Sequence, residues 1–353
     1  GKGAVEKVSM SRYIIRRLLQ AIPLLFIISV ILFVLMQNMG DPLATMGGRM
    51  PTRSADRERL SRQLGLDKPI YLQYIYWLVG NDWTMVDLDG DGEAETPGTR
   101  KGALRGDFGT SIVNRGRPVT TVIMDRLPNT LLLMLTAEVV IISSALVVGI
   151  YSALRQYSLL DTIMTGVSFI GFSMPIFFIA LLSMYLFAVN FKKWGLPYFP
   201  TVGMFEPAAG QTVAQVAWHM VLPVTSLAVI SLSGYSRYIR STMLEVMNQD
   251  YVRTAWSKGL SERIVIVRHA LKNALAPVMT MAGMQLGGIL GGSVIVEKIF
   301  VIPGMGLMGL RGVLGQDYPY IQGVVLVVAI AVVLANLLVD ISYGWFDPRI
   351  RVK

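Results

Sequence analysis

Long apolar runs alternate with polar segments along the 353 residues, and the apolar runs are long enough to cross a membrane. A spanning helix needs roughly 20 mostly apolar residues. Six segments meet this requirement, and each carries at most two ionisable residues: 14–36, 128–154, 162–190, 216–236, 273–296 and 321–345. The pattern therefore predicts an all-α membrane protein with six transmembrane helices.

The basic residues predict the orientation of these helices. Lys and Arg gather before the first apolar run, between the fourth and fifth runs, and after the sixth. Loops rich in Lys and Arg normally stay on the cytoplasmic side. We therefore expect 1–13, the loop 237–272 and 346–353 to be cytoplasmic, and 37–127 to be external. The remaining five helices form a core over 128–345. The first run is expected to stay as an uncleaved anchor, because no small-x-small cleavage site follows it.

The composition excludes several classes of function. The chain has no cysteine and two histidines on separate segments, so thiol chemistry and a histidine metal centre are not expected. It has no G-x-x-x-x-G-K-[S/T] loop, so ATP is not bound through that motif. No nucleophile, base and acid combine into a catalytic set, so we do not expect an enzyme. The net charge of +9 follows the membrane topology and does not indicate nucleic acid.

The external region 37–127 contains an abrupt change of composition. A short helix capped by Ser54 is expected to end near Gly65. The aromatic run Ile70 to Val79 then predicts a helix at the membrane interface. The following segment, 81–103, is rich in Asp, Gly and Glu and reads as a large acidic insertion between the first two membrane helices.

The acidic insertion begins like a calcium-binding loop. Carboxylates at alternate positions followed by a glycine can surround a hard cation. Position twelve of such a loop is normally a bidentate Glu, but it is Gly98 here. Two interpretations stay open, a weak Ca²⁺ site and a solvated acidic turn. The candidate ligands are Asp87, Asp89, Asp91, Glu93 and Glu95.

The most informative segment is DYVRTAWSKGLSERIVIVRHALKNALAP, from Asp250 to Pro277. It is basic and helix-prone, although it lies between two membrane-length runs. Tyr251 to Ser257 predicts a short helix, Gly259 permits a sharp turn, and Leu260 to Val267 predicts a second short helix. An ordinary basic cytoplasmic loop is the alternative interpretation.

This segment resembles the cytoplasmic coupling loop of ABC-importer permeases, and its YVRTA, SKGL and HALKNALAP pieces resemble the dipeptide/oligopeptide branch, which also includes nickel importers. The common Leu-Pro of the superfamily is replaced by Leu271-Lys272, with Pro277 arriving later. EKIFVIPGMG at 297–306 and the C-terminal DPRIR at 347–351 resemble the same family.

The resemblance implies a type I ABC importer permease fold in a bacterial or archaeal cytoplasmic membrane. It implies a second permease subunit of similar fold, two ABC ATPase subunits, an external substrate-binding protein and contact with membrane lipid, but no nucleic acid. The implied function is ATP-driven import of peptides by alternating access. The alternatives are import of oligosaccharides or nickel by the same class, and an ion-driven secondary transporter. The residues expected to contact an ATPase are Arg253, Thr254, Ala255, Lys258, Gly259, Leu260, Ser261, Glu262 and Arg263.

Two membrane segments carry candidate residues for the translocation path or a subunit interface. Glu138 lies inside the second span, where an ionisable group is costly. It could line the path or make a hydrogen-bonded contact between helices. Gln285, Gly287 and Gly291 lie on a glycine-rich fifth span. Small residues let helices approach closely in lipid, either between two permeases or within one subunit.

Overall fold

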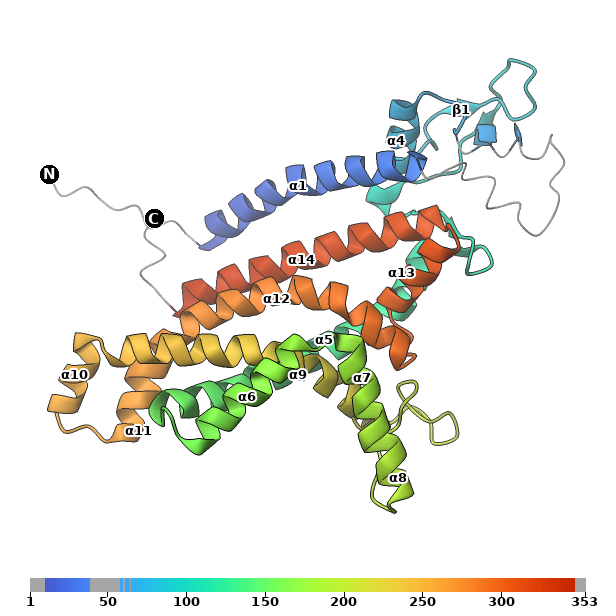
Figure 1. Cartoon of the computed structure of the whole chain (residues 1–353). Helices are drawn as coiled ribbons and strands as arrows, with labels where there is room; N and C mark the ends of the chain where they lie inside the picture. The colour runs from blue at the N-terminus through green and yellow to red at the C-terminus, as the bar shows by residue number, and fades with distance from the viewer. Residues whose placement is uncertain (1–9, 39–57, 60, 64, 347–353) are drawn as a thin grey trace, which may run out of the picture. The chain divides into compact units, whose positions relative to one another are not determined.

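The computed structural model describes residues 10–38, 58–59, 61–63 and 65–346; within these ranges, the side chains of 10–13, 276–277, 284–292, 339–340 and 342–346 are not described. The described chain is mostly helical (Figure 1). Its helices are α1 (Met10–Asn38), α4 (Ile70–Leu78), α5 (Val119–Leu154), α6 (Leu159–Ser173), α7 (Ile176–Met184), α8 (Phe191–Lys193), α9 (Val213–Met247), α10 (Asp250–Ser257), α11 (Glu262–Ile264), α12 (Lys272–Ile299), α13 (Met305–Leu314) and α14 (Tyr318–Phe346).

Shorter elements join these helices. Two segments are π-helical, η2 (Tyr185–Asn190) and η3 (Val265–Leu271), and one is a single 3₁₀ turn, η1 (Ala103–Arg105). Among the described residues, two small antiparallel sheets are present. They pair β1 (Met85–Val86) with β2 (Thr96–Pro97), and β3 (Thr110–Ser111) with β4 (Arg117–Pro118).

Among the described residues, five helical stretches are long and apolar enough to cross a membrane: Ile14–Asn38, Val119–Leu154, Ile176–Lys193, Val213–Met247 and Tyr318–Leu338. The helix α12 is 28 residues long and matches the predicted fifth span in position. The chain is therefore a multi-pass membrane protein.

The chain divides into two compact units, and each is described separately. The core unit comprises 1–18, 129–307 and 332–353, and the N-terminal unit comprises 19–128 and 308–331. In the core unit, α9 contacts α6, α7 and α12. Its buried face carries large apolar side chains that fill the centre of the unit, including Leu222, Leu227, Tyr235, Ile239 and Met243.

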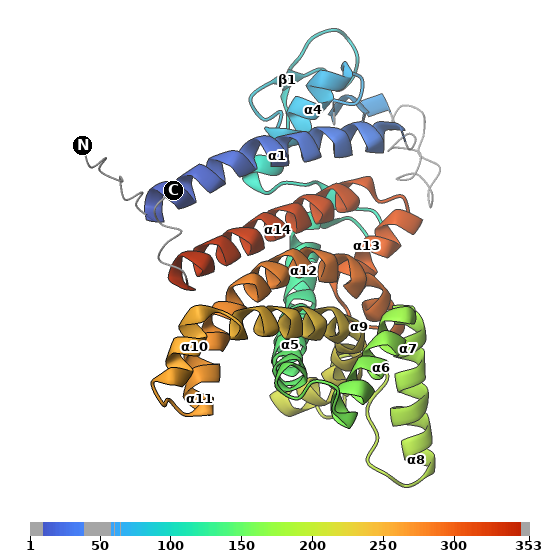
Figure 2. The same ribbon diagram turned by 60° about the vertical axis from the view of Figure 1, so that its left-hand side comes forward.

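The predicted third span, 162–190, is two helices instead of one. The chain is helical up to Ser173, turns extended at Met174 (φ −93°, ψ 136°) and resumes at Ile176 after Pro175. A residue before proline is pushed out of the helical region by the proline ring, so the apolar run continues while the helix does not. Figures 1 and 2 both show α7, η2 and α8 leaving α6 at a sharp angle.

Two predicted boundaries in the basic loop are also corrected. The fourth span was expected to end at 236, but α9 continues to Met247 because the polar residues that follow are good helix formers. The second short helix expected over 260–267 is not separate. Instead, α11, η3 and α12 follow one another without a break.

The N-terminal unit packs the C-terminal end of α1 against α4. Tyr74 and Trp77 of α4 lie against Phe33, with ring centroids 5.4 and 5.9 Å away. Tyr74 also shares a 2.7 Å hydrogen bond with Ser29 Oγ. The aromatic helix expected near 70–79 therefore exists. The helix expected to be capped by Ser54 lies partly outside the described residues.

Candidate functional site

The short helix α10 begins and ends where its sequence predicts. Asp250 occupies the first turn, where its charge complements the helix dipole. Thr254 and Ser257 donate their hydroxyls to carbonyl groups one turn earlier, at 2.9 and 3.0 Å. The helix stops at Lys258, and Gly259 follows with φ +71°. In that left-handed conformation a side chain is strained, so glycine fits the turn.

One face of α10 is buried against the rest of the core unit. Val252 is 0% exposed and Ala255 is 4% exposed, and both pack against Val265 of η3. The end of α9 and Leu260 complete this small apolar cluster. The side chain of Asn273 also donates a 3.0 Å hydrogen bond to the Tyr251 hydroxyl. The helix is therefore held on its own chain by packing as well as by the backbone.

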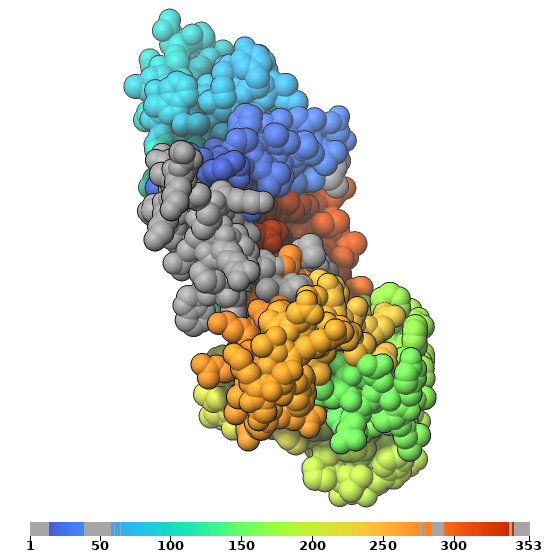
Figure 3. Space-filling model, turned by 90° about the vertical axis from the view of Figure 1, so that its left-hand side faces the viewer, coloured from blue at the N-terminus to red at the C-terminus, as the bar shows by residue number. Residues whose placement is uncertain are grey.

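The opposite face of α10 and the turn after it are exposed. We call this the coupling surface, and Figure 3 shows this end of the core unit facing the viewer in yellow and orange. Trp256 belongs to this surface, and its side chain is 41% exposed. Four cations and one carboxylate give the surface a positive charge. Its members are Arg253, Thr254, Trp256, Ser257, Lys258, Gly259, Ser261, Glu262, Arg263 and Arg268.

The sequence prediction placed nine residues in one coupling segment, and the structure separates them by role. Seven of them are exposed together: Arg253, Thr254, Lys258, Gly259, Ser261, Glu262 and Arg263. Ala255 is buried and Leu260 is half-buried, so these two anchor the segment instead of presenting it. Trp256, which was not among the nine predicted residues, is exposed with them. Its signal was a large aromatic residue three positions after Arg253 on a helix whose other face is apolar.

An ion pair joins α9 to the start of α6, within the core unit. Arg240 contacts the Asp161 carboxylate at 3.0 Å. The same oxygen accepts the backbone N–H of Tyr157 at 2.9 Å, and Ser158 caps α6 by accepting the Asp161 N–H. Asp161 is only 4% exposed. We call these residues the inner clamp. It fixes the turn between α5 and α6 to the helix that leads into α10.

Glu138, the candidate of the second span, makes a contact between helices. The Tyr235 hydroxyl of α9 donates a 2.6 Å hydrogen bond to its Oε1 atom. Both side chains are buried. This geometry is that of a hydrogen-bonded interhelical contact. The other candidates, Gln285, Gly287 and Gly291, lie on α12 outside the residues whose side chains are described.

The motif at 297–306 encloses a buried carboxylate. Thr130 donates a 2.7 Å hydrogen bond to Glu297 Oε1, and the Leu307 N–H donates to Oε2 at 2.8 Å. A Cβ at Gly304 would collide with the Glu297 carboxylate, so a larger residue there would have to displace this buried group. Asn129 donates to the Pro303 carbonyl at 2.9 Å. The segments around Thr130 and Glu297, 167 positions apart in the chain, thus pack together at the C-terminal end of α12.

In the acidic insertion, Asp87, Asp89 and Asp91 each place a carboxylate oxygen within 4.8 Å of the others. We call this the acidic turn. Asp87 accepts the N–H groups of Gly90 (2.6 Å) and Gly92 (3.1 Å). These bonds hold the pKa of Asp87 below its ordinary value. Within the described chain, Glu93 and Glu95 do not belong to this group.

A family comparison assigns the chain. The family described as "Binding-protein-dependent transport system inner membrane component" matches residues 145–352, and its N-terminal counterpart matches 10–134. The chain belongs to this family. It is a permease subunit of an ABC transporter, which confirms the resemblance seen in the sequence motifs.

Curated relatives agree with this assignment. The oligopeptide transport system permease protein AppB of Bacillus subtilis is 40% identical over 97% of this chain and 100% of its own length. The glutathione transport system permease protein GsiC of Salmonella choleraesuis is 35% identical over 98% of this chain and 100% of its own. A solved structure titled "Crystal structure of an amino acid ABC transporter with histidines" has a TM-score of 0.44 at 15% identity, covering 65% of this chain and 94% of that chain. That overlay is too weak to add to the assignment.

Proposed function

We propose that this permease moves peptides across the cytoplasmic membrane, driven by ATP hydrolysis on separate chains. The observation that carries the coupling role is the coupling surface, which is exposed and basic on a helix anchored to the core unit. The peptide substrate is supported by relatives whose names specify oligopeptides and glutathione. Glutathione is itself a short peptide, so both names indicate the same substrate class.

The proposed assembly contains a second permease of similar fold, two ABC ATPase subunits and an external substrate-binding protein. This chain has no Walker-type phosphate loop in its sequence, so it receives energy through contact. The exposed cations and Trp256 of the coupling surface suit an acidic groove with an apolar pocket on the ATPase. Aromatic and Arg side chains commonly dominate such interfaces.

The proposed mechanism is alternating access. Movement of the ATPases displaces α10, and its buried face passes the displacement to α9 and η3. The inner clamp then moves the turn between α5 and α6 with α9. A nucleotide can shift the equilibrium between inward-open and outward-open states only by binding them differently. The clamp and the α10 anchor are the contacts through which that difference reaches the membrane helices.

The proposed topology has six spans in a type I importer permease fold. The broken α6–α7 segment counts as the third span and α12 as the fifth. The segments 1–13, 237–272 and 346–353 are cytoplasmic, and 37–127 is external and includes the insertion 81–103. We also propose that the acidic turn binds Ca²⁺ weakly.

The deciding experiment is co-purification followed by reconstitution. The permease, its partner permease and the ATPases are expressed together with Trp256→Ala or Arg253→Glu. We expect loss of ATPase binding, while Thr212→Ala, at the opposite end of α9, retains it. Retention of the ATPases by both coupling variants would contradict the proposed contact.

The substrate is tested separately, with the purified binding protein. Peptides, oligosaccharides and Ni²⁺ are screened as its ligands, and uptake into vesicles is then measured with and without ATP. Uptake that follows an ion gradient without ATP would identify a secondary transporter. Binding of an oligosaccharide or Ni²⁺ alone would replace the peptide assignment and leave the transporter class intact.

A further inference from the structure

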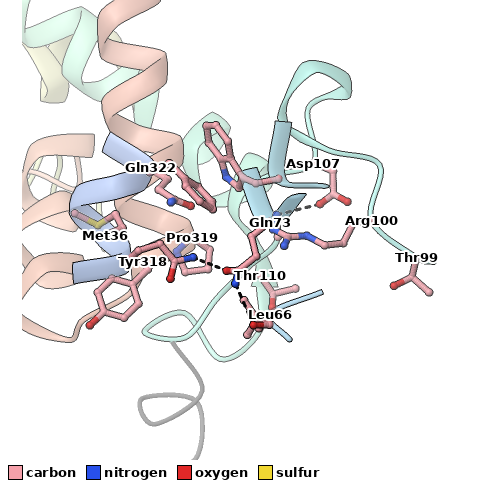
Figure 4. A pocket seen from close by; sticks show the side chains of 14 residues that line it. Met36, Leu66, Gln73, Thr99, Arg100, Asp107, Thr110, Tyr318, Pro319 and Gln322 are labelled. Carbon is pink, nitrogen blue, oxygen red and sulfur yellow. Dashed lines mark hydrogen bonds between the residues drawn. The ribbon is translucent and has the colours of Figure 1, made fainter. Parts of the chain in front are cut away.

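The N-terminal unit encloses a cavity of about 230 Å³. Its walls come from the end of α1, from α4, from the last part of the acidic insertion and the segment after it, and from the start of α14 (Figure 4). All of these elements belong to the same compact unit. The cavity is separate from the coupling surface, and the proposed transport mechanism does not use it.

The cavity is lined by the ends of two helices that are long and apolar enough to span a membrane. Phe33 and Gln37 belong to the last turns of the span Ile14–Asn38, and Tyr318 and Gln322 begin the span Tyr318–Leu338. Aromatic side chains favour the level at which a membrane span ends. A ligand held here would therefore lie at the level of lipid headgroups.

Two side chains of the cavity wall, Trp77 and Arg100, offer hydrogen-bond donors. The Asp107 carboxylate of the same wall lies near enough to Arg100 to act on its charge. Trp77 is 2% exposed, and its indole N–H has no hydrogen-bond partner among the residues that the structure describes. Leaving a buried donor unsatisfied is costly. Arg100 makes no ion pair with any carboxylate in the described part of the chain. Figure 4 shows its side chain extending toward Gln73. Burial lowers the pKa of Arg100, as expected for a desolvated cation.

Three other polar side chains of the wall, Gln37, Gln73 and Asp107, already make hydrogen bonds within the chain. Gln37 donates to Gln73 at 2.7 Å, and Gln73 donates to the carbonyl groups of Leu66 and Lys68 at 3.0 and 2.8 Å. Asp107 accepts the N–H groups of Lys101 (2.9 Å) and Gly109 (3.0 Å), one on each oxygen. The cavity therefore offers an indole and a guanidinium, and an occupant should supply acceptor oxygens.

An apolar stripe continues from the cavity along α1. Phe33 forms part of the wall. On the same face of the helix, Phe26 is 53% exposed and Ile22 is 60% exposed. Spacings of seven and four residues place these side chains one below another. An occupant with an acidic head and apolar chains would fit both features together.

We propose that this cavity binds the phosphodiester headgroup of a phospholipid in the outer leaflet. The phosphate oxygens accept hydrogen bonds from the Arg100 guanidinium, whose planar fork matches them, and from the Trp77 indole. The acyl chains follow the Phe26 and Ile22 stripe. The lipid would hold α1, α4 and the start of α14 together on the external side.

The test uses the complete permease complex, delipidated in detergent and then titrated with phosphatidylglycerol under native mass spectrometry. Trp77→Phe removes the donor and keeps the ring, and Arg100→Gln removes the cation. Each should weaken binding of one lipid roughly tenfold, the loss expected for one hydrogen bond to a charged group. Lys101→Gln removes a neighbouring exposed charge and should leave binding unchanged. Diacylglycerol, which lacks the phosphate, should not bind at this site.

Three outcomes would overturn the inference. The first is equal lipid binding by wild type, Trp77→Phe and Arg100→Gln. The second is equal affinity for inorganic phosphate and for phosphatidylglycerol, which would make the site one for free phosphate. The third is protection of the cavity by the substrate-binding protein instead of lipid. None of these readouts requires transport, so the proposed function can fail or hold independently.

Discussion

The turn at Gly259 should determine how well the coupling surface fits its proposed ATPase partner. The geometry of the turn predicts the order in which substitutions at Gly259 impair coupling. Gly259 has φ +71°, and a Cβ built there would meet nothing within 4 Å. A substitution is therefore penalised by backbone conformation and not by collision within the chain. Alanine in this conformation costs ~1–2 kcal/mol. Asparagine tolerates it better, and valine tolerates it worse because its branched Cβ is crowded.

Proline should be the most damaging replacement. Its ring holds φ at about −65°, which is incompatible with the φ of +71° at Gly259. It also removes the N–H that donates to the Trp256 carbonyl at 3.0 Å. We expect the stimulation of ATPase activity by substrate-loaded binding protein to fall in the order Asn, Ala, Val, Pro. The assay is ATP hydrolysis and substrate uptake in proteoliposomes, with the yield in the membrane fraction as the measure of insertion.

Gly195 provides a matched control. It follows α8 with φ +73°, it has open space around its Cβ position, and its N–H donates to the Lys192 carbonyl at 3.2 Å. The same four substitutions at Gly195 impose the same local strain away from α10, so they should leave ATPase stimulation unchanged. Two results would refute the reasoning. One is full coupling in Gly259→Pro. The other is an asparagine variant as defective as proline, which would point to a lack of space at the partner surface.

Three further predictions address topology, the inner clamp and the acidic turn. A single cysteine introduced at Thr96 should react with an impermeant thiol reagent in intact cells, whereas one at Ser261 should not; the reverse labelling would invert the topology. Asp161→Arg should weaken, but not abolish, the coupling of ATP hydrolysis to uptake, and adding Arg240→Asp should restore part of the lost coupling; no rescue in the double variant would argue against the ion pair as the acting contact. Calcium should protect the acidic turn from proteolysis with a dissociation constant of roughly 10⁻⁴ to 10⁻³ M, and Asp89→Asn should abolish this protection; no saturable effect at several millimolar would leave a solvated turn.

The sequence predicted most helices because apolar runs and membrane thickness are directly linked. The same signal failed at Pro175, where hydropathy stays high while the backbone turns extended. The local sequence signal was the position of Met174, because a residue directly before a proline is disfavoured in a helix. Hydropathy also failed to predict the end of α9, because the residues after the apolar run still favour a helix. Hydropathy indicates whether a segment lies in lipid or in water, whereas helix boundaries also depend on the backbone conformations that each residue allows.

The short helix α10 and the turn at Gly259 were predictable from the sequence, but the exposed face of this segment was not. Basic charge, Gly259 and the short helical run located it. Which residues face outward depends on the end of α9 and on η3, because Val252 and Ala255 are buried only where those elements pack against them. Contacts between residues far apart in the chain could not be predicted from any sequence pattern. Glu297 and Thr130 are 167 positions apart, so a single sequence offers no reason to pair them.

In the proposed mechanism, α9 is the element through which the short helix α10 would act on the membrane helices. This single helix of 35 residues carries Tyr235, which binds Glu138 of α5, and Arg240, which binds Asp161 of α6. Its last residues, Val246 and Met247, pack against the buried face of α10. Because helices are stiff along their axis, the proposed displacement of α10 would reach both polar contacts at once. Deleting either contact alone should therefore leave residual coupling, since the other still links α9 to its neighbour.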